Sequence, residues 1–129
     1  MKPEEGEVVI LMGLFNAGPL LAPQLESLRR QSHTAWRLIV SDDGSHDAGP
    51  ALVQAFAQHQ PDHDIALIKG PGQGFARNFV HLIRAAGPQV PYAAFSDQDD
   101  VWLPQKLARA VAALAELRAD RPALYCART

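Results

Sequence analysis

The chain alternates short apolar runs with stretches in which apolar residues recur every three or four positions. The runs at 8–13, 36–41, 64–69 and 91–96 are bounded by Gly, Pro, Asp or Asn, which is typical of buried strands. Between them, helical spacing is carried by Leu21, Leu25 and Leu28, by Phe75, Phe79, Leu82 and Ile83, and by Leu103, Leu107, Val111 and Leu114, with a weaker helix at 51–58. Such alternation predicts a mostly parallel sheet, since parallel neighbours need a crossover connection.

This order of elements predicts an α/β fold, with a Rossmann-like, open, mostly parallel sheet and helices on both faces. The apolar segment 123–127 predicts a fifth strand that stops just before the last two residues, 128–129. We therefore expect a flexible N-terminus over residues 1–7 and one domain over residues 8–129. We also expect this domain to be the first part of a longer protein.

Acidic residues follow two of the expected strands. Asp97, Asp99 and Asp100 follow the run that ends at residue 96, and Asp42 and Asp43 follow the run that ends at residue 41. Neighbouring carboxylates repel by roughly 4 kcal/mol at ~4 Å and an effective dielectric of about 20, unless a cation or water intervenes. Ligands of open α/β sheets bind outside these strand ends. The pattern favours a divalent cation site, and the alternative is a solvated turn with an acidic helix cap.

Composition narrows the class of protein. The 129 residues are 47% hydrophobic, which is enough for the core of one domain. The formal net charge is −2 and the basic residues are dispersed, which argues against nucleic acid as a partner. Cys126 is the only cysteine, so an internal disulfide and a cysteine-built zinc site are excluded, and a cytoplasmic setting is expected.

Five segments carry a resemblance to a known family. They are 9–16 (VILMGLFN), 24–28 with 31–32 (QLESL, QS), 41–45 (SDDGS), 74–79 (GFARNF) and 96–104 (SDQDDVWLP). In this order and spacing they resemble the N-terminal, donor-binding half of a family 2 glycosyltransferase with the GT-A fold, and the last segment is particularly similar to rhamnosyltransferase-like members. The resemblance covers nearly all of residues 8–115. It implies metal-dependent, inverting transfer of a sugar from a nucleoside-diphosphate sugar to an acceptor hydroxyl, in cell-surface polysaccharide biosynthesis.

The resemblance also implies roles for the matching residues. It assigns the donor nucleotide to Gly13, Leu14, Asn16, Asp42, Asp43, Arg77, Asp97 and Gln98, a divalent Mg²⁺ or Mn²⁺ to Asp97 and Asp99 of a D-x-D motif, and a donor-sugar contact to Asp100 and Trp102. Asp100 is also placed to cap the fourth helix, and Trp102 to pack in the core. One or two carboxylates suffice for such an ion when substrate phosphates complete its shell. Leu14 stands where family members usually carry Thr or Ser. At this position backbone groups, rather than a side-chain hydroxyl, are therefore expected to contact the nucleobase of the donor.

The expected partners follow from the same resemblance. The donor is a UDP- or dTDP-sugar, and the acceptor of the full-length protein is a glycan or a lipid-linked glycan. Residues 8–129 would be the nucleotide-sugar-binding domain, with the catalytic base beyond Thr129, so the isolated chain is expected to bind its donor without turnover. Apolar surface uncovered by such a truncation would allow a homodimer. Attachment of the parent protein to the inner membrane is left open.

Two other classes of protein stay as alternatives. Asp42 would suit the ribose contact of a dinucleotide-binding oxidoreductase, but the first strand runs into residues 13–18 (GLFNAG) rather than G-x-G-x-x-G. A noncatalytic nucleotide-binding or interaction module, such as a receiver-like domain, has this size. Receivers gather acidic residues after their first and third strands, however, and here the acids follow the second and fourth.

Overall fold

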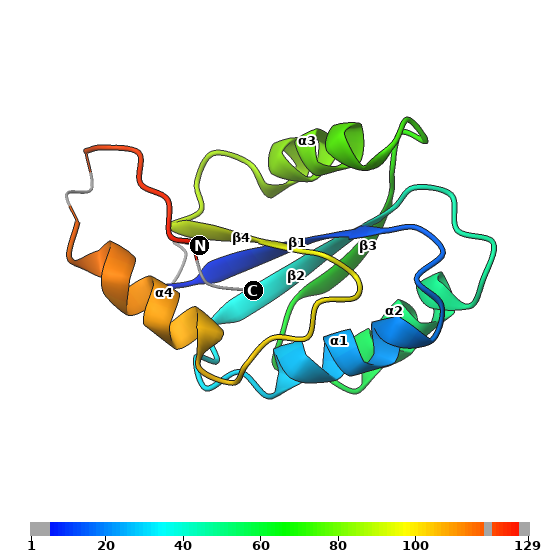
Figure 1. The fold of residues 1–129 in the computed structure, drawn as a ribbon, viewed down its shortest axis with the longest axis horizontal. Helices are drawn as coiled ribbons and strands as arrows, with labels where there is room; N and C mark the ends of the chain where they lie inside the picture. Colours follow the sequence, from blue (N-terminus) through cyan, green and yellow to red (C-terminus); the bar gives the residue numbers. More distant parts are fainter. Residues whose placement is uncertain (1–5, 118–119, 127–129) are drawn as a thin grey trace.

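Strands and helices alternate along the chain, as Figure 1 shows for the computed structural model, which describes residues 6–117 and 120–126. The strands are β1 Val8–Leu14, β2 Trp36–Asp42, β3 Ile65–Lys69 and β4 Tyr92–Ser96. The helices are α1 Leu21–Arg29, α2 Gly49–Gln58, α3 Phe75–Ala86 and α4 Lys106–Ala115, and a 3-10 turn, η1 Gly18–Leu20, leads into α1. Both ends of each strand lie within one residue of the range expected from the sequence.

In the described residues the strands form one parallel sheet in the order β3-β2-β1-β4. The central strand β1 pairs with β2 as far as Leu14↔Asp42 and with β4 as far as Met12↔Ser96. Because all these strands run in the same direction, the loops that follow them all lie at the same end of the sheet, where the carboxyl ends of the strands are. The acidic and glycine-rich segments are therefore brought together there, although they are far apart in the sequence.

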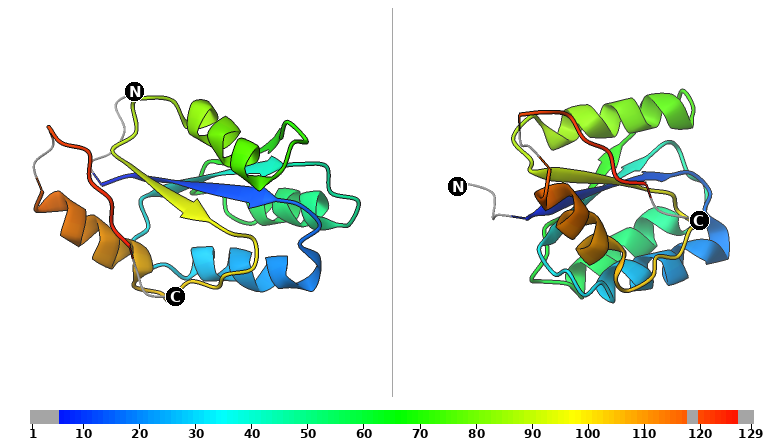
Figure 2. Two further views of the ribbon diagram at one scale, coloured as in Figure 1. Left: turned by 45° about the horizontal axis from the view of Figure 1, so that its top comes forward. Right: turned by 60° about the vertical axis from the view of Figure 1, so that its left-hand side comes forward.

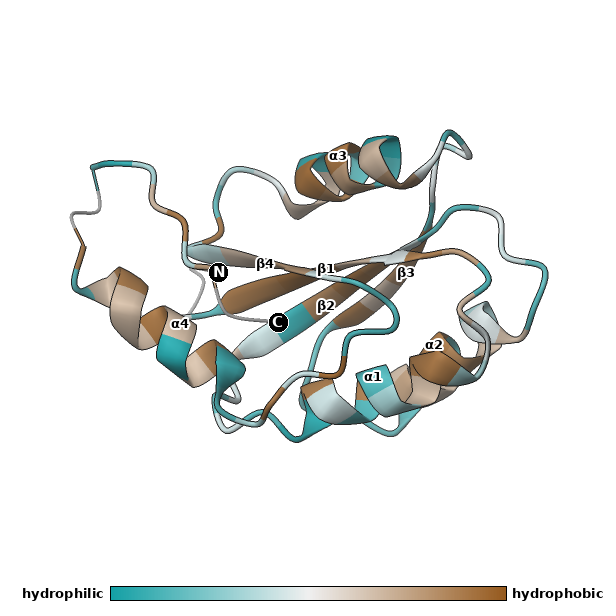
Figure 3. Ribbon diagram, in the orientation of Figure 1, coloured by the Kyte–Doolittle hydropathy of each residue, from teal (hydrophilic) through white to brown (hydrophobic). Residues whose placement is uncertain are grey.

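Helices cover both faces of the sheet. Figure 2 shows α3 on one face and α1 with α2 on the other. In β1, Ile10 and Met12 pack in the cluster that contains α1 and α2 residues, whereas Val9 and Leu11 pack with Leu82 of α3. A strand that is covered on both sides has no polar face, and β1 is hydrophobic along most of its length in Figure 3. The expected fold class is thus confirmed.

The fourth helix begins later than the sequence pattern predicts. Its N-cap is Gln105, so Asp100 does not cap it, and Leu103 lies before the helix and is 70% exposed rather than on its apolar face. Pro104 accounts for part of the delay, because the residue before a proline disfavours helical angles. The rest is explained by side chains of α1 that bind the backbone of this segment, as described below.

The fifth strand expected at 123–127 is not formed in residues 123–126, and residue 127 lies outside the described residues. This segment folds back toward the start of β4 (Figure 1), beside Tyr92, without pairing with the β4 edge. Leu124 is 82% exposed. This apolar run thus does not form a strand, although β4 beside it is an edge strand of the described sheet.

Two further points concern the N-terminal residues and the length of the helices. Of the N-terminal residues expected to be flexible, 1–5 lie outside the described part of the chain, and Glu7 forms an ion pair with Arg37 at 3.3 Å. None of the described helices has the length and apolar character needed to cross a bilayer.

Candidate functional site

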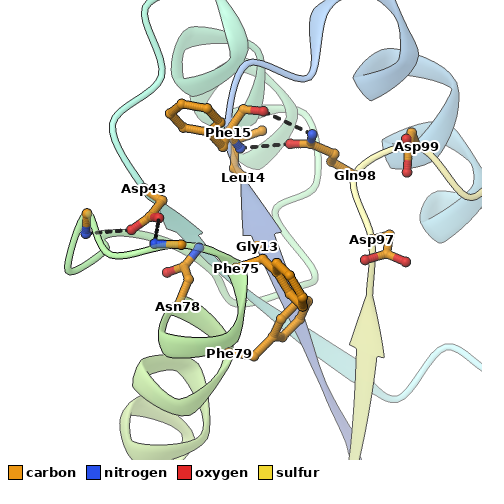
Figure 4. A pocket seen from close by; sticks show the side chains of 12 residues that line it. Gly13, Leu14, Phe15, Asp43, Phe75, Asn78, Phe79, Asp97, Gln98 and Asp99 are labelled. Carbon is orange, nitrogen blue, oxygen red and sulfur yellow. Dashed lines mark hydrogen bonds between the residues drawn. The ribbon is translucent and has the colours of Figure 1, made fainter.

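A pocket of about 430 Å³ lies at the carboxyl ends of the strands, a size usual for small-molecule sites. Figure 4 shows the acidic loop after β4 on one side, the glycine-rich loop and the start of α3 on the other, and the end of β1 between them. Six residues expected to bind the donor or a metal line it: Gly13, Leu14, Asp43, Asp97, Gln98 and Asp99. The parallel sheet brings these positions together.

The acidic loop offers two carboxylates to the pocket, those of Asp97 and Asp99 (Figure 4). Both residues are exposed, and no hydrogen bond or ion pair with another described residue engages either carboxylate. Such oxygens suit a hard divalent cation. Within the described residues, no group of three or more His, Cys, Asp or Glu side chains surrounds a metal position. An ion at this loop would therefore need additional oxygen ligands from a substrate or from water.

Asp43, on the other side of the pocket, holds the glycine-rich loop. Its Oδ1 accepts the N–H of Gly72 at 2.6 Å and its Oδ2 accepts the N–H of Gly74 at 3.2 Å (Figure 4). The two glycines have φ values of 71° and 96°, which glycine adopts without the strain of a side chain. Asp43 was expected to contact the nucleobase, and here its carboxylate also orders the loop that leads into α3.

A buried polar pair beneath this loop fastens α3 to β2. Ser41 Oγ donates to Asn78 Oδ1 at 2.5 Å, and Asn78 Nδ2 donates to the carbonyl oxygen of Ser41 at 2.9 Å. Both residues are buried. A Cβ added at Gly70 would lie 2.6 Å from Asn78 Oδ1 and 2.8 Å from Asp43 Oδ1, so a side chain at this position would have to displace the pair.

Gln98 connects the acidic loop to the end of β1. Its side-chain amide exchanges two hydrogen bonds with the backbone of Phe15, at 2.8 and 3.0 Å (Figure 4). The sequence comparison with the family suggested a contact between Gln98 and the nucleotide. In this structure both ends of the amide are engaged by the protein.

Polar side chains on the buried side of α1 and just after it hold the segment that follows the acidic loop. Ser27 Oγ accepts the N–H of Trp102 at 3.1 Å. Gln31 donates to the carbonyl oxygen of Leu103 at 2.8 Å and accepts the N–H of Leu107 at 3.1 Å. Both side chains are buried. They supply partners for the N–H groups of Trp102 and Leu107, and a second donor, beside the N–H of Lys106, for the carbonyl oxygen of Leu103.

Gln24 extends this set to the start of the acidic loop. Its Nε2 donates to Ser96 Oγ at 2.9 Å, and Ser96 Oγ donates to the carbonyl oxygen of Asp97 at 2.9 Å. Gln24 is fully buried, and its Oε1 has no hydrogen-bond partner among the described residues. We call Gln24, Ser27 and Gln31 the α1 polar face. It holds the acidic loop from both of its flanks.

Three residues expected to bind the nucleotide do not line the pocket. Asp42 Oδ1 accepts the N–H of Ser45 at 3.0 Å, and Asn16 Oδ1 accepts the N–H of His46 at 2.8 Å. Arg77, exposed near the start of α3, donates to a glutamine of the glycine-rich loop at 2.8 Å. In this structure all three bind to loops beside the pocket rather than facing its interior.

The two residues expected to contact the donor sugar also lie off the pocket lining. Trp102 is 5% exposed and belongs to the core cluster, and Lys106 Nζ lies 5.4 Å from the centre of its ring. Of the two roles expected for Trp102, packing is therefore the one seen. Asp100 is exposed.

Six lining residues were not among the expected site residues: Phe15, Gly72, Gly74, Phe75, Asn78 and Phe79. Phe75 and Phe79 stand four residues apart, so they share one helix face, and both rings lie at the pocket in Figure 4. The spacing predicts the helix, yet Phe75 is 81% exposed. Helical spacing identifies a face, but it does not tell whether protein covers that face.

The fold and the pocket define an α/β domain of the nucleotide-binding type, with its ligand site at the ends of parallel strands. The sequence model of glycosyl transferase family 2 matches residues 9–123. The chain belongs to this family, which confirms the resemblance found in the sequence. The oxidoreductase and receiver-like alternatives are left without support.

Relatives of known sequence agree with this assignment. The chain is 33% identical over 103 residues to UDP-Glc:alpha-D-GlcNAc-diphosphoundecaprenol beta-1,3-glucosyltransferase WfgD of Escherichia coli, covering 78% of this chain and 38% of the relative. It is 30% identical over 112 residues to glycosyltransferase EpsE of Bacillus subtilis (87% and 40%) and 28% identical over 103 residues to dTDP-rhamnosyl transferase RfbG of Shigella flexneri (78% and 35%). The chain thus spans 35% to 40% of the length of these relatives.

Solved structures show the same fold. Mannosyltransferase PcManGT from Pyrobaculum calidifontis, in complex with GDP-Man and Mn²⁺, matches with a TM-score of 0.76 and 25% identity, over 89% of this chain and 33% of that chain. TarS residues 1–349 of S. aureus, in complex with UDP-GlcNAc, matches with a TM-score of 0.67 and 22% identity, over 85% and 31%.

Proposed function

We propose that the protein is a glycosyltransferase and that this chain binds its donor, a nucleoside-diphosphate sugar. The observation that carries the proposal is the pair of unpartnered carboxylates, Asp97 and Asp99, in a pocket at the strand ends of a family 2 chain. Relatives named for UDP-Glc and dTDP-rhamnosyl transfer support a UDP- or dTDP-sugar as donor.

Asp97 and Asp99 would hold a divalent Mg²⁺ or Mn²⁺. Two carboxylates fit such an ion, because diphosphate oxygens and water complete its shell, and the similar mannosyltransferase structure contains Mn²⁺ with GDP-Man. When bound, the ion would act as a Lewis acid that stabilises the departing diphosphate.

Other residues of the chain would bind and orient the nucleotide. Asp43 can keep its bonds to the glycine-rich loop and still accept an N–H of the base, since a carboxylate has about four acceptor positions. The backbone at Gly13 and Leu14 lies at the same pocket. Arg77, near the N-terminus of α3, is placed where anions are favoured and would reach the nucleotide if its bond to the glycine-rich loop is exchanged.

The transfer itself would be inverting, with a carboxylate base that deprotonates the acceptor hydroxyl. We assign no residue of this pocket to that role. A lipid-linked acceptor at the inner membrane is supported by the diphosphoundecaprenol acceptor in the name of the Escherichia coli relative.

The test is calorimetric binding of UDP, dTDP and their sugars to the purified chain, with and without Mn²⁺. The variant Asp97→Ala/Asp99→Ala is expected to lose the effect of Mn²⁺, with affinity at least about tenfold weaker, as losses around metal ligands typically are. Asp62→Ala/Asp64→Ala is the matched control, because it removes two exposed carboxylates just before β3, at the opposite end of the sheet. Absence of nucleotide binding in every condition, or equal binding by both variants, would overturn the proposal.

A further inference from the structure

Gln98 pairs with the chain in the manner of a strand residue, although it lies in a loop. Phe15 N–H donates to Gln98 Oε1 at 2.8 Å, and Gln98 Nε2 donates to the carbonyl oxygen of Phe15 at 3.0 Å. Two directly opposed residues of an antiparallel pair exchange the same two bonds. The backbone pairing of β1 with β4 ends at Met12↔Ser96, so this side chain continues the connection beyond the last paired residues.

These two bonds join the two sides of the pocket. Gln98 lies between Asp97 and Asp99 in the sequence, and Phe15 follows Leu14 at the end of β1. Among the described residues, no other hydrogen bond links residues 97–100 with residues 13–16. Beyond the last paired residues of β1 and β4, the hydrogen-bonded link between the acidic loop and the β1 end is therefore made, within the described residues, by one side-chain amide.

We propose that Gln98 is a positioning residue, a latch that holds the acidic loop against the end of β1 so that metal and nucleotide can be bound together. The inference rests on the proposed function and deepens it, because it assigns to Gln98 the coupling between the two halves of the donor site. In this role Gln98 acts through the backbone of Phe15 and not by touching the donor.

Two substitutions separate the latch from other roles. Gln98→Met keeps the length of the side chain and removes both bonds. Gln98→Glu keeps the acceptor for Phe15 N–H, but at neutral pH it sets a carboxylate oxygen against the Phe15 carbonyl, and when protonated it becomes a donor again. Gln54→Glu, at an exposed position of α2, is the control for the added charge.

The first measurement needs no ligand: hydrogen exchange of the Phe15 amide by NMR, compared with the wild type at each pH. Exchange is expected to be roughly tenfold faster in Gln98→Met at all pH values and in Gln98→Glu at neutral pH. In Gln98→Glu, protection should return as the introduced carboxyl is protonated. Unchanged Phe15 exchange in both variants would overturn the latch.

The second measurement is the factor by which Mn²⁺ strengthens binding of UDP or dTDP. We expect Gln98→Met to reduce this factor about tenfold, as outer-shell substitutions do, and Gln54→Glu to leave it unchanged. A merely structural role would lower thermal stability without changing the factor. If the wild type binds nucleotide and Gln98→Met keeps the full factor, the coupling is wrong. If the wild type binds no nucleotide, the proposed function fails and the coupling with it, whereas Phe15 exchange still decides whether the latch exists.

Discussion

Aspartates at the strand ends of this protein differ in what surrounds them, not in their chemistry. Asp43 accepts two backbone N–H groups, while the carboxylates of Asp97 and Asp99 accept no hydrogen bond from the described residues. Hydrogen bonds to a charged group stabilise a fold, whereas unpartnered like charges at one loop do not. The residue type therefore predicts a polar site, and the partners show which carboxylates are available to a ligand.

The first prediction compares these carboxylates by urea unfolding. Asp43→Ala is expected to lower the free energy of unfolding by about 1.5–3 kcal/mol, because two N–H groups of the glycine-rich loop lose a charged partner. Asp97→Asn/Asp99→Asn should change it by less than about 0.5 kcal/mol or raise it, since surface changes without lost bonds are small. Greater destabilisation by the second variant would contradict this account.

The second prediction concerns Glu26. Its hydrogen bonds to Arg29, the largest cause, and to Arg30 lower its pKa from 4.5 to about 2, and desolvation by burial opposes them. The stabilisation from a lowered carboxyl pKa is present above pH 4.5 and is lost as the pH falls toward 2. Because the pair is exposed, Glu26→Gln should cost less than about 1 kcal/mol at pH 7.

The measurement is chemical unfolding of wild type and Glu26→Gln across this range. Their difference should shrink from pH 4.5 toward pH 2, and also in high salt, which screens exposed charges. Glu116→Gln, at the exposed end of α4, is the control and should show no such trend. A difference that grows on acidification would refute the assignment.

At the scale of elements, α1 is both a core helix and a support for the pocket. Its leucines pack in the cluster with β1, and its polar face binds the flanks of the acidic loop. The apolar spacing predicts the helix, but it does not indicate that polar side chains of the same region bind the acidic loop. Buried polar groups are costly unless they are paired, so their pairing here implies a defined path for the loop.

The third prediction tests that support with two buried glutamines. Gln31→Leu should lower the free energy of unfolding by about 1–3 kcal/mol, because a buried N–H of Leu107 loses its partner and the carbonyl of Leu103 keeps only the N–H of Lys106. Gln24→Leu should cost less, since only its bond to Ser96 is lost and its Oε1 is already unpaired. Unfolding in urea checks the order, and a larger loss for Gln24→Leu would refute it.

The elements were predictable because the strands have consistent local signals. β1 and β2 are built around apolar runs, residues 8–12 and 38–40, and their parallel direction follows from the helices between them. The segment 123–127 misled because an apolar run does not show whether its backbone will pair with a neighbouring strand. The six expected residues that line the pocket came from strand ends and the family motifs. The bonds of Gln98 and Gln31 span 83 and 72 to 76 positions, and no local pattern reports such contacts.

In the molecule as a whole, the core borders the pocket at Leu14 and Phe79. The two hydrophobic clusters lie on the two faces of the sheet, and the pocket lies at the carboxyl ends of its strands. Nothing in the core depends on a ligand. The fold should therefore form without metal or nucleotide, and binding should add stability by mass action alone.

The fourth prediction follows for thermal unfolding. EDTA should leave the melting temperature unchanged, and Mn²⁺ with UDP or dTDP should raise it. At a ligand concentration one hundred times Kd the gain is about 2.7 kcal/mol. The rise should be clearly smaller in Asp97→Ala/Asp99→Ala and of full size in Asp62→Ala/Asp64→Ala. A fall in melting temperature on adding EDTA would show that the fold itself needs a metal.

The α1 polar face also bears on how such a protein can diverge. Ser27 and Gln31 bind N–H and C=O groups of residues 102, 103 and 107, and the backbone at these positions offers the same groups whatever the side chain, proline excepted for the N–H. Side chains along the acidic loop and its flank can thus be replaced during evolution while the backbone path of the loop is kept. New donor preferences can then arise by single substitutions, without an intermediate that loses the fold.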